Sequence, residues 1–246
     1  VFILQGASSI EKLELNGNVK VSSLFGGYSA NVPTSLKEVT VNANSTIITA
    51  NFLNGCGMVE KVNLPSTIKE IRSFAFANCR LIKDINIENV ESIGDEAFLG
   101  CLELTNISYS NHLSNIGTKV FMGTKWLDES KEEFIVINNI LIKFNNINNI
   151  EDVVVSDNIV MVAGGAFTGD NTIKSITFGQ NIVKLNSGSF DSCTNLHKIV
   201  LNTTHVVNID LYIFDTLSSF TVDVNNDIID EYKENVYWSL YSDLLK

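Results

Sequence analysis

Phenylalanine recurs through most of this 246-residue chain at a nearly constant interval. Successive members of the series are 22, 23, 23, 23, 23 and 24 positions apart. An interval held constant at about 20 to 50 residues is the signature of a repeat architecture, because each repeat is one supersecondary unit. The chain is therefore expected to fold as a stack of repeats. The series comprises Phe76, Phe98, Phe121, Phe144, Phe167, Phe190 and Phe214, and Leu53 extends it backward by one step.

A second series of apolar residues keeps the same phase. Each repeat has three apolar residues spaced by three and then two positions, and the last two alternate with polar residues, as in a half-buried strand. One repeat cannot bury its own apolar face, so we expect the strands to stack over a continuous core. The fifth triplet ends at Tyr109, and the last is Leu217, Phe220 and Val222. The triplets begin at Ile10, Leu36, Val59, Ile82, Leu104, Ile150, Ile173, Leu196 and Leu217.

A pair of apolar residues, eight and five positions before the aromatic, predicts a second extended segment in each repeat. Gly94 and Gly117 follow the second member of the pair, and Asn186 takes that place once. Glycine and asparagine tolerate a left-handed backbone. We therefore expect a tight corner with positive φ at these residues.

The triplet series fails after Leu127, where Ser130 and Glu132 are polar. Residues 134–144 read FIVINNILIKF, two apolar runs on either side of Asn138-Asn139. Because asparagine accepts the positive φ of a type I′ turn, this pattern predicts a β-hairpin that replaces one strand layer, with Trp126 packed nearby.

The composition excludes several classes of protein. With 17 basic and 28 acidic residues the net charge is -11, which argues against a nucleic-acid partner. No apolar run reaches the length of about 18 residues that indicates a membrane span. The apolar content of 45% suits a globular core rather than a disordered chain.

Four cysteines fall on one repeat position, so we expect them to be buried small apolar residues rather than ligands or nucleophiles. They are Cys56, Cys79, Cys101 and Cys193.

No motif for catalysis is present: there is no G-x-S-x-G, H-E-x-x-H, P-loop or dinucleotide fingerprint. His112, His197 and His205 share no spacing, and His197 is expected on the surface of a strand. The acidic residues of 128–133 and 151–152 lack the spacing of a calcium loop and are expected to form a solvated surface. The sequence therefore predicts no catalytic residue, no cofactor and no metal site.

The repeat of residues 79–101, CRLIKDINIENVESIGDEAFLGC, resembles the BspA-type (LRR_5) bacterial leucine-rich repeat in its strand triplet, its IG and AF pairs and its cysteine. The resemblance covers about residues 10–222. The main departure is the family's proline, which only Pro65 provides. The resemblance implies a right-handed, β-rich leucine-rich-repeat solenoid with repeats of about 23 residues, here with an inserted β-hairpin.

We expect a single repeat domain over 1–246, from a fragment of a longer chain. Residues 10–222 would form the repeats, 134–144 the hairpin and 228–246 a capping helix. The segment 24–41 resembles an irregular longer repeat of the family, and Val1 to Leu4 form an apolar, strand-like stretch. A solenoid needs a cap to shield its last layer. The cap residues expected to cover that layer are Tyr232, Trp238, Leu240 and Leu244.

The outward positions of the strand triplets form the candidate binding face, because repeat proteins commonly bind through such surfaces. The resemblance implies a noncatalytic module of a secreted or cell-surface bacterial protein that binds protein or glycan and acts in adhesion. The alternatives are a structural spacer, which displays another domain from the cell surface, and an enzyme whose site the motifs do not reveal. The candidate face contains Lys61, Asn63, Asp84, Asn86, Asn106, Ser108, Ser175, Thr177, Lys198 and Val200.

Overall fold

The computed structural model describes residues 9–17 and 34–246, and the chain groups into two compact units that divide after Ser130. Each unit is a stack of repeats built from two rows of strands. The expected apolar stretch of residues 1–4 and the first part of the irregular repeat, 24–33, lie outside the described residues. A single domain over 1–246, and its origin in a longer chain, stay predictions.

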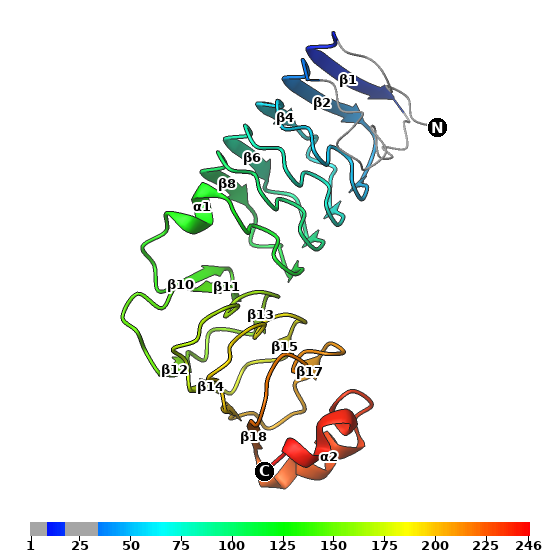
Figure 1. Cartoon of the computed structure of the whole chain (residues 1–246). Coiled ribbons are helices and arrows are strands. Elements are labelled where there is room, and N and C mark those ends of the chain that lie inside the picture. The colour runs from blue at the N-terminus through cyan, green and yellow to red at the C-terminus, as the bar shows by residue number, and fades with distance from the viewer. Residues whose placement is uncertain (1–8, 18–33) are drawn as a thin grey trace. The chain divides into compact units, whose positions relative to one another are not determined.

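The first unit has two rows of parallel strands, and Figure 1 shows the first row as successive arrows. Neighbouring strands pair residues about one repeat apart, as in Val39 with Val62 and Ile71 with Ile93. The first row holds β1 (Lys12–Gly17), β2 (Glu38–Ala43), β4 (Lys61–Asn63), β6 (Asp84–Ile87) and β8 (Asn106–Tyr109). The second row holds β3 (Ile47–Ile48), β5 (Glu70–Ile71), β7 (Ser92–Ile93) and β9 (Asn115–Ile116), and the short helix α1 (Lys125–Asp128) follows.

The second unit repeats this plan. Its first row holds β12 (Asp152–Val155), β14 (Ser175–Phe178), β16 (Lys198–Leu201) and β18 (Thr221–Val224). Its second row holds β10 (Phe134–Ile137), β11 (Ile140–Phe144), β13 (Met161–Val162), β15 (Lys184–Leu185) and β17 (Asn208–Ile209). The chain then forms η2 (Asn226–Ile228), α2 (Ile229–Glu234) and η3 (Trp238–Leu244).

The phenylalanine series forms the core of each unit, as predicted. All seven rings are buried. In the first unit the rings of Phe76 and Phe98 stack with centroids 5.2 Å apart, and in the second unit those of Phe167 and Phe190 stack at 5.8 Å. The period of the sequence is therefore the period of the layers.

The cysteines lie in the same core, as predicted, and all four are buried and free. The Cys79 thiol donates a hydrogen bond of 3.2 Å to the carbonyl oxygen of Leu53, one layer back. The Cys193 thiol donates one of 2.9 Å to the carbonyl oxygen of Phe167. Cys79, Cys101 and Cys193 thus each link their layer to the aromatic position of the preceding layer.

The corner glycines have a different role from the one predicted. Gly94 and Gly117 do not have positive φ. A Cβ atom on Gly94 would lie 2.6 Å from the backbone nitrogen of Ser73, so glycine is needed for the close approach of two layers.

The left-handed residue stands instead two positions before the aromatic in every repeat of the series except that of Phe144, where Ile142 lies in β11. It is Asn51, Phe74, Glu96 and Lys119 in the first unit, and Gly165, Gly188 and Tyr212 in the second.

One triplet assignment is wrong. In β18, Val222 pairs with Ile199 and Val224 with Leu201, so the last strand is shifted by two residues from the expected triplet. The triplet that ends at Tyr109 has the predicted register, since Tyr109 pairs with Ile87, but the Tyr109 side chain is exposed because β8 is the last strand of its sheet.

The predicted hairpin is present, with β10 and β11 antiparallel around the turn at residues 138–139. Asn138 has a φ of 54°, but Asn139 is not in the left-handed region, so the turn is not type I′. The hairpin joins the second row, since Leu141 pairs with Val162. At the failed triplet the chain forms α1 instead, and Trp126 packs on Phe121 with ring centroids 5.1 Å apart.

The predicted cap closes the second unit, where Figure 1 places α2. Tyr232 and Trp238 are buried as expected, and the Trp238 indole N–H donates a 2.6 Å hydrogen bond to the carbonyl oxygen of Val207. Leu244 is half-buried against the core. The expectation for Leu240 is wrong, because its side chain points to solvent.

The sequence did not predict how the free edge of β18 is covered. The backbone N–H of Lys246 donates to Val222, and that of Val224 donates to Lys246. The last residues of the chain thus pair with this edge.

Candidate functional site

All ten predicted site residues lie on first-row strands, and none is buried. Six of them belong to β4, β6 and β8 of the first unit, and four belong to β14 and β16 of the second. The candidate face is therefore two surfaces, one on each unit.

The six residues of the first unit line one open groove with a volume of about 740 Å³. Sequence reasoning missed Glu60 and Lys83, which stand one position before their strands, and the half-buried Leu81. The complete lining is Glu60, Lys61, Val62, Asn63, Leu81, Lys83, Asp84, Ile85, Asn86, Asn106 and Ser108. We call this surface the β4/β6 groove.

The groove lies where the strand ladder is interrupted. β1, β2 and β4 form one hydrogen-bonded sheet and β6 and β8 form another, with no pairing between β4 and β6. The second row remains continuous through β5 and β7, and the Phe76 and Phe98 rings stay stacked. The strand ladder is therefore interrupted on the strand face alone, and β4 and β6 exchange no ladder hydrogen bonds there.

Side chains on this face are partly occupied with one another. Glu38 lies between Lys12 and Lys61, with nitrogen–oxygen distances of 3.0 and 3.3 Å. Hydrogen bonds from the two lysines hold the pKa of Glu38 below its ordinary value, and the bond that Lys12 donates to Glu38 raises the pKa of Lys12. Asn106 Nδ2 donates to Asp84 Oδ1 at 2.5 Å, which leaves Asp84 Oδ2 for a ligand. The groove combines ammonium donors with carboxylate and amide acceptors.

The strand face of the second unit is more apolar. Thr177 pairs with Val154 on one side and Val200 on the other, so these three outward positions form a β-branched row. Ser175 donates a 2.6 Å hydrogen bond to Asp152, and Lys198 forms an ion pair with Asp223 at 2.8 Å, so two of the predicted residues already have partners.

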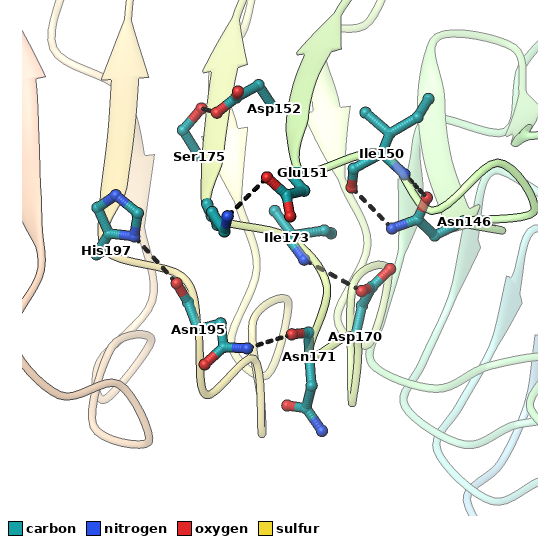
Figure 2. A network of polar contacts seen from close by, with 11 residues as sticks. Asn146, Ile150, Glu151, Asp152, Asp170, Asn171, Ile173, Ser175, Asn195 and His197 are labelled. Atoms are coloured by element: carbon teal, nitrogen blue, oxygen red, sulfur yellow. Dashed lines mark hydrogen bonds and ion pairs between the residues drawn. The ribbon is translucent and has the colours of Figure 1, made fainter.

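Figure 2 shows the polar contacts beside this second face. The Ile173 backbone N–H donates to Asp170, and Asn195 Nδ2 donates to the Asn171 carbonyl oxygen at 2.5 Å. His197 is exposed just before β16, with Nδ1 3.1 Å from the Asn195 carbonyl oxygen. These groups hold turns in place.

The other candidate groups for chemistry are dispersed. Within residues 9–17 and 34–246, no three His, Cys, Asp or Glu side chains are placed to hold a metal ion. Burial raises the pKa of the Cys56 and Cys101 thiols to about 12, so they are protonated at neutral pH and poorly nucleophilic. In the described part of the chain, no helix has the length and apolarity needed to cross a bilayer.

Repeats of about 20 to 29 residues that each contribute a strand to a stack, closed by a terminal cap, are characteristic of leucine-rich-repeat solenoids. The sequence matches the BspA-type leucine-rich repeat region in six copies, over residues 5–131 and 142–238. The chain belongs to this family, as the resemblance in the sequence indicated. The match is interrupted between 131 and 142, where the first strand of the hairpin lies.

Several solved bacterial structures are similar. The pneumococcal vaccine antigen PcpA is 14% identical, with 91% of this chain and 74% of that chain covered and a TM-score of 0.47. A leucine-rich cell surface protein from Faecalibacterium prausnitzii is 14% identical, with 88% and 69% covered and a TM-score of 0.38. A leucine-rich repeat protein from Eubacterium ventriosum is 18% identical, with 85% and 72% covered and a TM-score of 0.44. A search of the curated proteins found no match.

Proposed function

We propose that this chain is a noncatalytic binding module of a secreted or surface-displayed bacterial protein, and that it contacts a protein or glycan partner through the β4/β6 groove. The observation that carries the proposal is the groove itself, because six outward residues chosen from the repeat pattern line one cavity. The groove offers donors and acceptors from side chains and from an interrupted strand ladder, which suits a polar partner.

Family membership supports the class of function. BspA-type repeats form a repeat family that is typically noncatalytic. One of the similar structures is described as a vaccine antigen and another as a cell surface protein. An extracellular location for this chain is proposed on the same grounds.

A structural spacer is the second candidate function. The ion pairs of Glu38 with Lys12 and Lys61 favour it, because a face whose charges pair internally has less to offer a partner. A spacer would leave the groove filled with water alone.

One substitution tests the groove with a matched control. Ser108 and Thr177 occupy the same repeat position, three repeats apart, on exposed and half-exposed strand positions. Tryptophan is compatible with a strand, so Ser108→Trp should fill the β4/β6 groove while Thr177→Trp changes only the second face. Both proteins are compared with the wild type on an array of extracellular-matrix proteins and glycans.

Saturable binding that Ser108→Trp abolishes and Thr177→Trp retains is the expected result. If Thr177→Trp loses binding and Ser108→Trp retains it, the groove is refuted as the binding site. No binding of the wild type to any member of the array would favour the spacer.

A further inference from the structure

The outer surface of the C-terminal cap carries large apolar side chains in contact with solvent. Val236 is 72% exposed, Tyr237 42% and Leu240 62%. Single exposed apolar residues are normal, but three within five positions form a patch. A terminal cap ordinarily presents a polar outer surface for solubility. This cap therefore departs from what sealing the stack requires.

The patch is held rigidly by the buried side of the same segment. The Asn235 side chain accepts hydrogen bonds from the backbone N–H groups of Tyr237 and Trp238, at 3.0 and 3.3 Å. Trp238 is fully buried and anchored to Val207. The Leu240 N–H donates to the Tyr237 carbonyl oxygen, so these two residues share one 3-10 turn. A surface fixed in this way loses little conformational entropy when it binds.

Acidic residues flank the patch in the sequence. Five acidic side chains of the cap are exposed, and only two lysines accompany them. The second unit has 7 basic and 15 acidic residues, a net charge of 7 − 15 = −8, against 10 − 13 = −3 for the first. The five exposed acids are Asp227, Asp230, Glu231, Glu234 and Asp243.

We propose that this patch docks a basic amphipathic helix of a partner protein. The apolar side chains of the partner helix would cover Val236, Tyr237 and Leu240. The lysines or arginines of that helix would face the carboxylates of the cap. The charge argues against the other common partner of an apolar patch, an anionic membrane, because both surfaces would be negative. This interaction uses a different surface from the β4/β6 groove and does not depend on it.

A synthetic peptide of leucine and lysine, with leucines at helical spacing, is the probe. The fluorescence anisotropy of this peptide is measured as a function of the concentration of each protein. The three proteins are the wild type, Val236→Ser/Leu240→Ser and Ile147→Ser. Ile147 is a matched control because it is 59% exposed in the same unit but lies outside the cap. Tryptophan fluorescence and circular dichroism check that each variant keeps the wild-type fold.

We expect saturable binding by the wild type and Ile147→Ser, weakened at least tenfold, or about 1.4 kcal/mol, by the double substitution. Binding should also weaken with salt and with Glu234→Gln/Asp243→Asn. Equal binding of a scrambled peptide of the same composition would overturn the proposal, as would unchanged binding by Val236→Ser/Leu240→Ser. Dimers of the wild type that the double variant does not form, or binding to phosphatidylserine vesicles, would assign the patch to another occupant and overturn it too.

Discussion

Alanine at Gly117 tests whether close approach between layers explains the corner glycines. A Cβ atom there would lie 2.5 Å from Asp95 Oδ1, 2.7 Å from the Asp95 nitrogen and 2.9 Å from the Gly94 carbonyl carbon. Ordinary contacts between heavy atoms begin at about 3.5 Å, so all three distances are overlaps. Two of the three atoms belong to the main chain of the preceding layer and cannot rotate away.

The cost has two parts. Overpacking of a dense interior costs about 1–3 kcal/mol. The Asp95 carboxylate also accepts a 2.7 Å hydrogen bond from the Thr118 N–H, and displacing it forfeits about 1 kcal/mol more. We therefore expect Gly117→Ala to lower the free energy of unfolding by about 2–4 kcal/mol.

Gly57 provides the control in the same unit. Its φ is also outside the left-handed region, but the nearest atom to an added Cβ would be the Asn78 carbonyl oxygen at 3.6 Å. Gly57→Ala should then be neutral or stabilising by up to about 1 kcal/mol, because alanine restricts the unfolded chain. Urea denaturation followed by circular dichroism and tryptophan fluorescence measures both variants.

A double-mutant cycle separates the two parts of the cost. In an Asp95→Ala background the carboxylate contact is gone but the main-chain contacts remain, so the penalty of Gly117→Ala should shrink without vanishing. If Gly117→Ala unfolds within about 0.5 kcal/mol of the wild type, the inference that layer spacing requires glycine is refuted.

Three further predictions concern other parts of the fold. Tyr212→Gly should stabilise the chain by about 1 kcal/mol in thermal or urea denaturation, because an exposed non-glycine residue now holds a φ of 63°. Trp238→Phe should destabilise it by about 1–3 kcal/mol in the same assays, because the buried carbonyl oxygen of Val207 loses its donor. The buried thiols of Cys56 and Cys101, with pKa values raised from 9.0 to about 12, contribute stability that is complete below pH 9. That stability should be lost as the pH rises from 9 toward 12, by about 1.4 kcal/mol per thiol per pH unit. The urea midpoints of unfolding at pH 8 and pH 10.5 measure this loss. A midpoint equal at both pH values, or a Trp238→Phe protein as stable as the wild type, would contradict the corresponding argument.

Periodic features of the fold were predictable because burial follows the repeat. The phenylalanine and cysteine positions are buried in every layer, and the hairpin at 134–144 follows from its paired apolar runs. Register at the end of the stack was not predictable in the same way. Phe220, Val222 and Val224 alternate with polar residues, and such a strand pairs equally well in two registers until the packing is known. The structure selects the later register, with Val222 beside Ile199.

Features that depend on the spacing between layers left no trace in the sequence. The triplets of β4 and β6 resemble their neighbours, yet the ladder between these strands is broken. The sequence shows only that residue 94 is glycine. It does not show whether glycine is needed there for positive φ or for the close approach of two layers. The actual left-handed position is filled by residues as different as Phe74, Lys119 and Gly165, because the turn is imposed by hydrogen bonds between layers.

The regular parts of this solenoid satisfy their own polar groups. Strand N–H and C=O groups pair with the adjacent layer, and side chains such as Lys198 with Asp223 pair along the face. A ligand that binds there must break existing bonds for each one that it forms, which yields little net affinity. Both candidate interaction surfaces lie instead where the strand ladder is interrupted or ends, between β4 and β6 and at the cap beyond β18. We therefore expect a partner to gain the most from binding at these two interruptions.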